Sequence, residues 1–310
     1  MEKPFGFVVI DKPPGLTSHD CVNRLRKIYG IKKIGHGGTL DPSVTGVLPI
    51  AIGNATRLIC YLQGSKTYKG IIQLGAFTTT DDQQGELKES GIWPLINNRN
   101  LEKILENFRG EILQKPPVFS SVHIKGERAY KRARRGDNFD LTPKKITIND
   151  LKLINWSQQK GEIEIHVDCS SGTYIRSLAR DIGAKIGCGA YLKKLRRTKS
   201  YDFTENHSVL LPEESDMNLK NKKPKILDPI DFLSHLPVYK LKSEEEIISW
   251  RSGRRINIDF FNSIDSNQIK HRENNAKNIL ILDQDNDIEG IAEIQEELTL
   301  KPKVVFNAIG

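Results

Sequence analysis

The segment from residue 35 to residue 53 restricts the fold most, because five glycines and two prolines interrupt it. Glycine weakens a helix and proline removes one of its hydrogen bonds, so no long helix can run through this segment. It is predicted to be a loop that ends in a short apolar strand, Val47 to Ile52. Pro42 disfavours helical backbone at the preceding residue, which places the carboxylate of Asp41 on the loop.

A strand, a turn and a helix are predicted before this loop. Residues 5–10 are apolar and β-branched and run into the rigid turn Asp11-Lys12-Pro13-Pro14-Gly15. Thr17 and Asp20 form a capping-box pattern ahead of apolar residues at helical spacing, and Gly30 ends that helix.

The segments after this loop are predicted to include both strands and helices. Residues 68–75 and 163–169 predict strands, and residues 100–110 and 175–187 predict helices. Because strands and helices do not alternate regularly, the predicted fold class is α+β with a mixed sheet rather than a doubly wound sheet.

A second, smaller unit is predicted near the C-terminus. Residues 212–225 are polar and predict a linker or an exposed excursion, and residues 262–278 predict a polar loop. Around them lie a short helix near 243–250 and strand-like pieces at 279–282, 290–294 and 304–306. We therefore divide the 310 residues into a domain of residues 1–235 and a β-rich domain of residues 236–310.

The composition restricts the classes of protein to which this chain can belong. Lys and Arg number 47 against 39 Asp and Glu, and this net charge of +8 modestly favours a polyanionic partner. The four cysteines lack the spacing of a zinc or redox motif, which predicts reduced thiols in a cytoplasmic protein. No apolar run approaches the length that spans a membrane, so we expect a soluble protein with no membrane partner.

The glycine-rich loop allows several chemical interpretations. As bare chemistry, Asp41-Pro42 is a common structural turn, and His36 alone is typical of a satisfied loop histidine. A phosphate-binding loop is excluded because no Gly-Lys-Ser/Thr triplet follows the glycines. An aspartyl-phosphate site is disfavoured because Ser43 stands where such enzymes usually carry a second acid. No cluster of His, Asp or Glu has the spacing of a metal site, so no metal is predicted.

The loop Gly35-His36-Gly37-Gly38-Thr39-Leu40-Asp41-Pro42, with Thr45-Gly46-Val47-Leu48-Pro49 after it, resembles the signature loop of the TruB family of bacterial tRNA pseudouridine synthases. Further segments match in the family's order, and together they cover residues 5 to about 200. These are residues 11–18, 66–68, 74–75 with 78–82, and 172–178 leading into 187–190 and 195–197. Ser252-Gly253 and Gly290-Ile291-Ala292 are similar to a PUA-like RNA-binding module.

The resemblance implies an enzyme that isomerises uridine 55 in the tRNA T loop to pseudouridine, with a flipped base and no cofactor. It implies that Asp41 is the nucleophile and that Arg176 is the cation which keeps this carboxylate ionised against burial. It also implies that Tyr68 stacks on the target base. Tyr174 and Leu195 would line the pocket of the flipped nucleotide, and His36 would fill the gap that the base leaves.

Two basic clusters are predicted to contact phosphates of the tRNA T-arm stem-loop. The first comprises Lys125, Arg128, Lys131, Arg132, Arg134 and Arg135, and the second Lys193, Lys194, Arg196, Arg197 and Lys199. We expect Lys131, Arg132, Arg134 and Arg197 to bind the substrate, without a guide RNA or an obligate protein partner. Two alternatives stay open: a guide-RNA-dependent relative that acts on ribosomal RNA, and an RNA-binding or tRNA-folding protein without catalysis.

Overall fold

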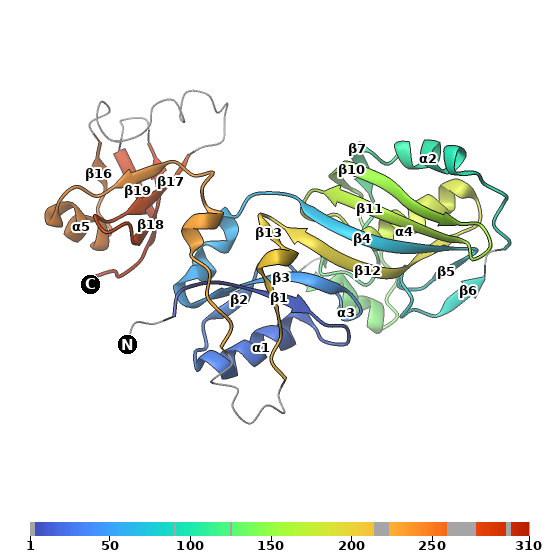
Figure 1. The fold of residues 1–310 in the computed structure, drawn as a ribbon, viewed down its shortest axis with the longest axis horizontal. Coiled ribbons are helices and arrows are strands. Elements are labelled where there is room, and N and C mark those ends of the chain that lie inside the picture. The colour runs from blue at the N-terminus through green and yellow to red at the C-terminus, as the bar shows by residue number, and fades with distance from the viewer. Residues whose placement is uncertain are drawn as a thin grey trace.

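Two sheets of different size organise the chain, as Figure 1 shows. The computed structural model describes residues 4–89, 91–124, 126–213, 223–258, 277–295 and 299–309. The predicted linker and polar loop therefore lie largely outside the described residues, as does Lys125 of the first basic cluster. None of the described helices is long and apolar enough to cross a membrane.

The large sheet has ten strands, in the order β14-β1-β3-β12-β4-β11-β10-β7, with β2 added on β3 and β13 on β12. The pairs β1–β14 and β3–β12 are parallel and the others are antiparallel. The sheet is therefore mixed, and the predicted α+β class is confirmed. Its strands are β1 (Gly6–Lys12), β2 (Ile34–His36), β3 (Thr45–Ile52), β4 (Lys66–Leu74), β7 (Gly110–Gln114), β10 (Lys144–Ser157), β11 (Glu162–Cys169), β12 (Ala190–Ser200), β13 (Phe203–Thr204) and β14 (Ser208–Leu210).

Three helices cover one face of this sheet and bury its main core. They are α1 (Ser18–Tyr29), α2 (Asn98–Glu106) and α4 (Ile175–Ile186). The predicted capping box of α1 is present, since the Thr17 hydroxyl accepts from the Asp20 backbone amide and the Asp20 carboxylate accepts from the Thr17 amide. Gly30 and Gly187 end α1 and α4 in the left-handed conformation, as the sequence predicts.

Short elements complete this part of the chain. They are β5 (Ala76–Thr78) with β6 (Leu87–Glu89), β8 (His123–Ile124) with β9 (Glu127–Arg128), the helix α3 (Ala129–Arg134), and 3-10 turns at Gly53–Arg57, Ile59–Tyr61, Glu205–His207 and Pro229–Phe232.

The C-terminal sheet has five strands in the order β15-β17-β18-β19-β16. They are β15 (Val238–Lys240), β16 (Ile256–Asn257), β17 (Asn278–Leu282), β18 (Ile288–Ile294) and β19 (Thr299–Val305), with the helix α5 (Glu244–Arg251) beside them. This sheet confirms the predicted β-rich C-terminal part, whereas the division at residue 235 stays a prediction.

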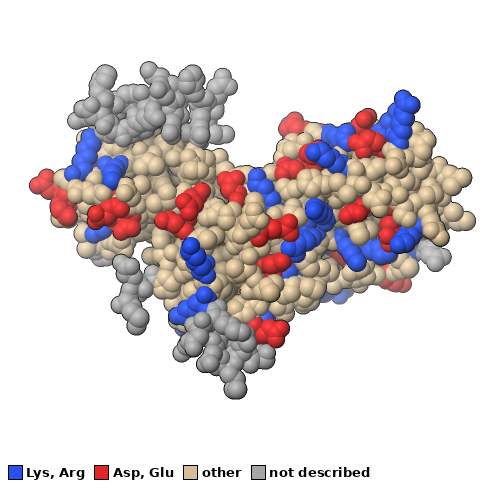
Figure 2. All heavy atoms as spheres, viewed as in Figure 1, with Lys and Arg blue, Asp and Glu red and all other residues tan. Residues whose placement is uncertain are grey.

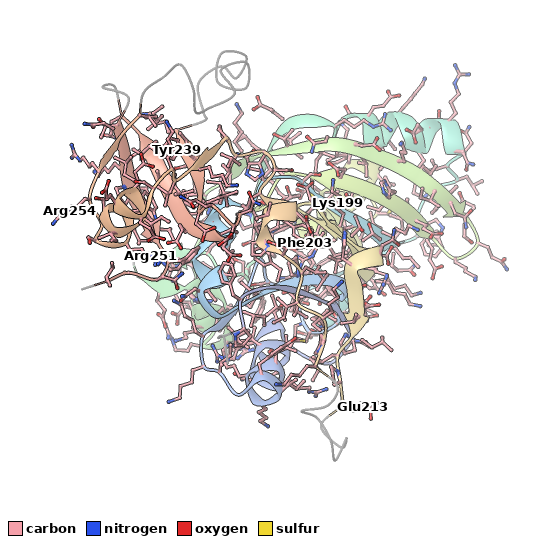
Figure 3. All side chains as sticks on the ribbon, turned by 60° about the vertical axis from the view of Figure 1, so that its left-hand side comes forward. Lys199, Phe203, Glu213, Tyr239, Arg251 and Arg254 are labelled. Carbon is pink, nitrogen blue, oxygen red and sulfur yellow. The ribbon has the colours of Figure 1, made fainter. Side chains whose placement is uncertain are left out.

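The C-terminal sheet shares a hydrophobic core with the large sheet. Phe7 of β1 and Phe203 of β13 lie in one cluster with Leu280 of β17, Ile288 of β18 and Phe306. Phe203 also stacks on Phe232, with ring centroids 4.0 Å apart (Figure 3). Deleting the C-terminal residues would therefore expose apolar surface of the large sheet, so the two parts are expected to depend on each other for stability.

This shared core predicts the effect of Phe306→Ala. Phe306 is 4% exposed, and its ring centroid lies 5.2 Å from that of Phe5. We expect a loss of about 3–5 kcal/mol in the free energy of unfolding, with one cooperative transition in urea. Ile309→Ala is the matched control: its side chain is 54% exposed, and its effect should stay within about 0.5 kcal/mol. Two separate transitions, or a negligible effect of Phe306→Ala, would contradict the shared core.

Candidate active site

The loop that carries Asp41 is held by the turn between β1 and α1. The Lys12 ammonium is buried and donates to the carbonyls of Pro13 at 2.9 Å, Leu16 at 2.6 Å and Pro42 at 3.1 Å. The Pro42 carbonyl also accepts from the Gly15 amide at 2.8 Å. These contacts explain why the turn at residues 11–15 and the glycine-rich loop occur together, because the first fixes the backbone of the second.

A serine at the start of α1 fixes the residue before Asp41. The Ser18 hydroxyl accepts from the Leu40 amide at 2.8 Å and donates to the Leu40 carbonyl at 3.2 Å. Ser18 and Leu40 are both buried. The contacts of Lys12 with Pro42 and of Ser18 with Leu40 fix the backbone on each side of Asp41. They do not involve the Asp41 side chain, which can therefore meet a ligand.

Asp41 and Arg176 form the ion pair at the centre of this site. Arg176 Nε lies 3.0 Å from Asp41 Oδ2, and the arginine side chain is 8% exposed whereas that of Asp41 is 39% exposed. Arg176 stands in the first turn of α4 and donates to the carbonyls of Thr80 and Phe119, each at 3.0 Å. The Arg176 guanidinium thus contacts two carbonyls and one carboxylate, and these three partners fix its orientation.

A second carboxylate, Asp82, belongs to the same group of charges. Its Oδ2 lies 3.7 Å from Arg176 Nη1, and its side chain is 8% exposed. Burial raises the pKa of the Asp41 carboxyl, Arg176 opposes that rise, and Asp82 adds to it. The sequence predicts no role for Asp82, because only its position beside Arg176 in space sets it apart from Asp81.

Tyr68 of β4 and Leu195 of β12 belong to the same hydrophobic cluster, on the helix-covered face of the sheet. Tyr68 is 7% exposed, and burial raises the pKa of its phenol, so the hydroxyl stays protonated at neutral pH. Leu195 pairs with Gly70, where an added Cβ would lie 3.3 Å from the leucine Cδ1. The glycine therefore leaves room for the leucine beside the tyrosine.

Tyr174 directly precedes α4 and is positioned through its backbone. Its amide donates to Gln114 Oε1 at 2.9 Å and its carbonyl accepts from Gln114 Nε2 at 3.1 Å. Gln114 is buried at the end of β7, so this pair ties the sheet edge to the start of the helix that carries Arg176.

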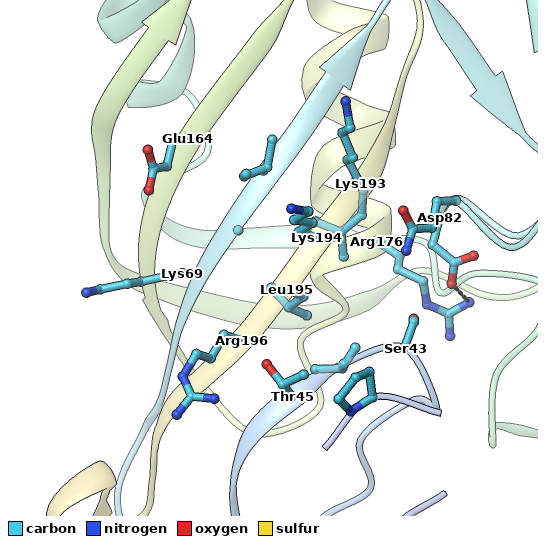
Figure 4. Close-up of a pocket in the computed structure, with 16 residues that line it drawn as sticks. Ser43, Thr45, Lys69, Asp82, Glu164, Arg176, Lys193, Lys194, Leu195 and Arg196 are labelled. Atoms are coloured by element: carbon cyan, nitrogen blue, oxygen red, sulfur yellow. Dashed lines mark ion pairs between the residues drawn. The ribbon is translucent and has the colours of Figure 1, made fainter. Parts of the chain in front are cut away.

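A pocket of about 410 Å³ opens beside this group. Figure 4 shows Arg176 and Asp82 facing each other on one side of the pocket and Lys69 with Glu164 on the other. Further lining residues come from the loop after Asp41 and from β12, and they are Ser43, Thr45, Leu195 and Arg196 among others. The pocket therefore combines an apolar wall with charged groups at both ends, which suits a ligand that has a flat base and a charged backbone.

His36 lies in β2, at the start of the glycine-rich loop. Its Nδ1 accepts from the Gly38 amide at 3.4 Å. Burial lowers the pKa of the imidazole, and the Arg197 guanidinium lowers it further, so the ring is neutral at pH 7.

Arg197 lies inside the protein, which corrects the expectation that it contacts a phosphate at the surface. Its side chain is fully buried on β12, and it donates to the carbonyls of Val47 at 2.8 Å and Gly38 at 3.2 Å. The reason is the pleat of β12, because Arg196 points to the open face and pairs with Asp11 and Glu205 while Arg197 points inward.

The first basic cluster lies on and around α3. Lys131 and Arg134 are exposed, and the Arg134 guanidinium lies 5.5 Å from the Tyr130 ring. Arg132 pairs with Asp137 at 3.2 Å and stacks on Phe139 at 5.1 Å. Aromatic rings thus support two of the three predicted substrate-binding cations, and ion pairing already neutralises part of the charge. On the face shown in Figure 2, Lys and Arg side chains gather along the large sheet with acidic side chains among them.

Metal binding finds no support in this region. Among the residues that the structure describes, no three His, Cys, Asp or Glu side chains are grouped so that they could hold a metal ion.

Comparison with known proteins gives a consistent family. The model of the TruB family pseudouridylate synthase N-terminal domain matches residues 26–175, and that of the tRNA pseudouridylate synthase B C-terminal domain matches residues 176–233. Proteins named tRNA pseudouridine synthase B are similar over the full length of both chains. The protein of Prochlorococcus marinus strain NATL1A is 68% identical, and that of Parasynechococcus marenigrum strain WH8102 is 48% identical.

Solved structures with the same fold are more distant in sequence. A crystal structure of a Cbf5-Nop10-Gar1 complex matches with a TM-score of 0.69 and 25% identity, covering 97% of this chain and 84% of that chain. An H/ACA ribonucleoprotein bound to a substrate RNA that contains 2′-deoxyuridine also gives a TM-score of 0.69, at 23% identity, covering 97% and 85% of the two chains.

The ion pair predicts how Asp41 titrates when Arg176 is replaced. A neighbouring cation favours the charged carboxylate, so Arg176→Met should raise the pKa of Asp41 above its already raised value. Carboxyl-carbon NMR titration of the wild type and the variant measures this change. Arg109→Met, which removes a guanidinium paired with Glu102 instead, is the control and should leave the Asp41 titration in place. An unchanged or lowered pKa of Asp41 in Arg176→Met would disprove the electrostatic coupling.

Proposed function

The chain belongs to the TruB family and is a tRNA pseudouridine synthase, and from this premise we propose that it modifies uridine 55 in the T loop with Asp41 as the nucleophile. The observation that carries the proposal is the contact of 3.0 Å between Arg176 Nε and Asp41 Oδ2. It places a cation beside a partly exposed carboxylate, which favours the charged form that the reaction needs.

The reaction is an isomerisation. The bond between uracil N1 and ribose C1′ breaks, the base turns, and a new bond joins C5 to C1′. Substrate and product have the same atoms and oxidation state, so the residues of the chain can perform the reaction without a cofactor. A carboxylate at Asp41 can take up ribose C1′ or act on the base, and both routes require it to be charged.

The residues around Asp41 suit a base that has left its stack. We propose that Tyr68 stacks on the flipped uracil while Leu195 and Tyr174 enclose it. His36, neutral at pH 7, would fill the gap in the RNA. Such contacts offset the cost of unstacking one base, which is a few kcal/mol.

Phosphate contacts would supply much of the affinity for the T-arm stem-loop. Lys131, Arg132 and Arg134 are the proposed contacts, because all three stand on the short helix α3. Phe119, whose carbonyl accepts a hydrogen bond from Arg176, lies shortly before this helix in the chain. Binding at α3 would thereby be linked to the residue that pairs with Asp41.

Two alternatives predict different behaviour. A guide-RNA-dependent enzyme is disfavoured, because relatives named tRNA pseudouridine synthase B are up to 68% identical whereas the matched Cbf5 complex is 25% identical. An RNA-binding or tRNA-folding protein without catalysis would have no need to hold the buried Arg176 beside the partly exposed Asp41 carboxylate. We therefore propose an enzyme that works on tRNA alone, in the cytoplasm, without an obligate protein partner.

An isolated T-arm stem-loop tests the substrate. The protein should convert uridine 55 of this fragment to pseudouridine without any guide RNA, because the proposed contacts all fall within the stem-loop. Mapping pseudouridine along full-length unmodified tRNA and along the fragment measures the position. A fragment that stays unmodified until a guide RNA is added would support the first alternative instead, and a product at another uridine would refute the assignment to position 55.

The nucleophile is tested by Asp41→Asn. Asparagine keeps the size of the side chain but cannot form the covalent bond, so the rate should fall by at least about four orders of magnitude. Binding of the stem-loop should stay within a few-fold, because phosphate contacts and stacking are untouched. Single-turnover rates and equilibrium binding separate the two quantities.

Three controls accompany this experiment. Tyr68→Phe keeps the stacking ring, so it should bind normally and lose rate only as far as the hydroxyl matters. Asp181→Asn removes a carboxylate of α4 that pairs with Arg180 instead, and should retain the wild-type rate. EDTA should change nothing, because no metal is proposed. Near-normal turnover by Asp41→Asn would exclude this carboxylate as the nucleophile.

A further inference from the structure

Arg197 is an unusual arginine, because it is buried without a carboxylate. Its side chain is 0% exposed, and no ion pair joins it to any carboxylate of the described residues. An arginine stays charged at all accessible pH values, and burying an uncompensated charge is unfavourable. This chain therefore carries an energetic cost at the centre of its large sheet, and the surroundings of Arg197 indicate what the cation does there.

Two hydrogen bonds fix the guanidinium in one orientation. Nε donates to the Val47 carbonyl of β3 at 2.8 Å, and Nη2 donates to the Gly38 carbonyl of the glycine-rich loop at 3.2 Å. The Cα of Gly38 also faces the two cations, because a Cβ added there would lie 3.0 Å from Lys66 Nζ and 3.6 Å from Arg197 Nη1. Arg197 thus connects the middle of the sheet to the loop that carries Asp41.

The third nitrogen of the guanidinium makes no hydrogen bond of normal geometry among the described residues. Arg197 Nη1 is buried and makes no hydrogen bond within the described part of the chain. Arg197 and Tyr68 are direct partners in the antiparallel pair of β12 and β4, and both side chains are buried. Burial raises the pKa of the Tyr68 phenol, and the charge of the Arg197 side chain and its hydrogen bonding to the phenol oppose that rise. Cys169 of β11 and Asp41 of the loop are the other titratable groups that act on the phenol.

We propose that Arg197 is a positioning residue for the reaction, whose free Nη1 donates a hydrogen bond to the hydroxyl oxygen of Tyr68 in the tRNA complex. The proposal rests on the proposed function of this site. An arginine can only donate, so a hydroxyl oxygen that accepts from it must direct its own proton elsewhere. Asp41 acts electrostatically on the phenol, so that proton would be directed toward Asp41 and the site proposed for the flipped nucleotide. Arg197 would then set both the direction of the Tyr68 proton and, through Gly38, the backbone before Asp41.

A double-mutant cycle with Arg197→Lys and Tyr68→Phe tests this inference. Lysine keeps the charge but has one nitrogen, which cannot hold the Val47 and Gly38 carbonyls and also reach the phenol. In the wild-type background, Arg197→Lys should lower the single-turnover rate by about 10- to 100-fold, the worth of one hydrogen bond to a charged group. Its Kd for the T-arm stem-loop should stay within about threefold, because Arg197 is too deeply buried to touch RNA. In the Tyr68→Phe background, the same change should cost at least about threefold less than in the wild-type background, because the hydroxyl is gone and only the part that acts through the Gly38 carbonyl remains.

Three controls make the result decisive. Arg109→Lys changes an arginine that also bonds a backbone carbonyl, that of Leu151, and should retain the wild-type rate. Circular dichroism establishes that the variants are folded, and Arg197→Gln replaces Arg197→Lys if the lysine variant is not. Wild-type protein must form pseudouridine 55 in the same assay, and a failure there would refute the proposed function rather than the role of Arg197.

Two outcomes would overturn the inference while the proposed function stands. If Arg197→Lys slows the reaction equally in both backgrounds, the arginine acts only through the glycine-rich loop. If Tyr68→Phe retains the wild-type rate, the hydroxyl has no task that Arg197 could position.

Discussion

The candidate site depends on the contact between the Arg176 guanidinium and the Asp41 carboxylate, because burial at this place favours the neutral form of the carboxyl. Burial raises the pKa of Asp41 and the Asp82 carboxylate adds to that effect, so the Arg176 guanidinium must oppose both. An arginine can do this only if its other donors are satisfied, because an unpaired buried donor is costly. The carbonyls of Thr80 and Phe119 provide those partners. Segments that lie far apart in the sequence are thereby joined around a single guanidinium.

The mixed sheet brings these segments together. The strand β12 lies between β3, to which it is parallel, and β4, to which it is antiparallel. The glycine-rich loop leads into β3, Tyr68 stands on β4, and Leu195 and Arg197 stand on β12, so adjacent strands deliver the parts of one site. Gly46 is required at this junction, because an added Cβ would lie 2.1 Å from the Arg197 carbonyl oxygen and the backbone has a φ of +103°.

Elements with local signals could be predicted from the sequence, and elements defined by tertiary contacts could not. The caps of α1 and α4 and the alternation of β11 depend on neighbouring residues, and the structure has them where the sequence places them. By contrast, β12 contains register shifts between Leu192 and Lys194 and between Arg197 and Lys199 against β4. These shifts break the period of two that marks a strand, so its cations read as one continuous basic surface.

The ordinary pleat between these two shifts explains why neighbouring arginines have opposite environments, because successive side chains of a strand point to opposite faces. Arg196 lies on the open face and forms a bidentate pair with Asp11, whereas Arg197 lies in the core without a carboxylate. Charge counting along the sequence treats both as contributors to RNA affinity, although only an exposed cation can release counterions from a phosphate. A buried cation acts on what surrounds it, and here it faces a phenol, a neutral imidazole and the loop that carries Asp41. Under the proposed function, the positive charge of this site would therefore have two separate roles: exposed cations would attract the nucleic acid, and the buried one would arrange the groups that meet it.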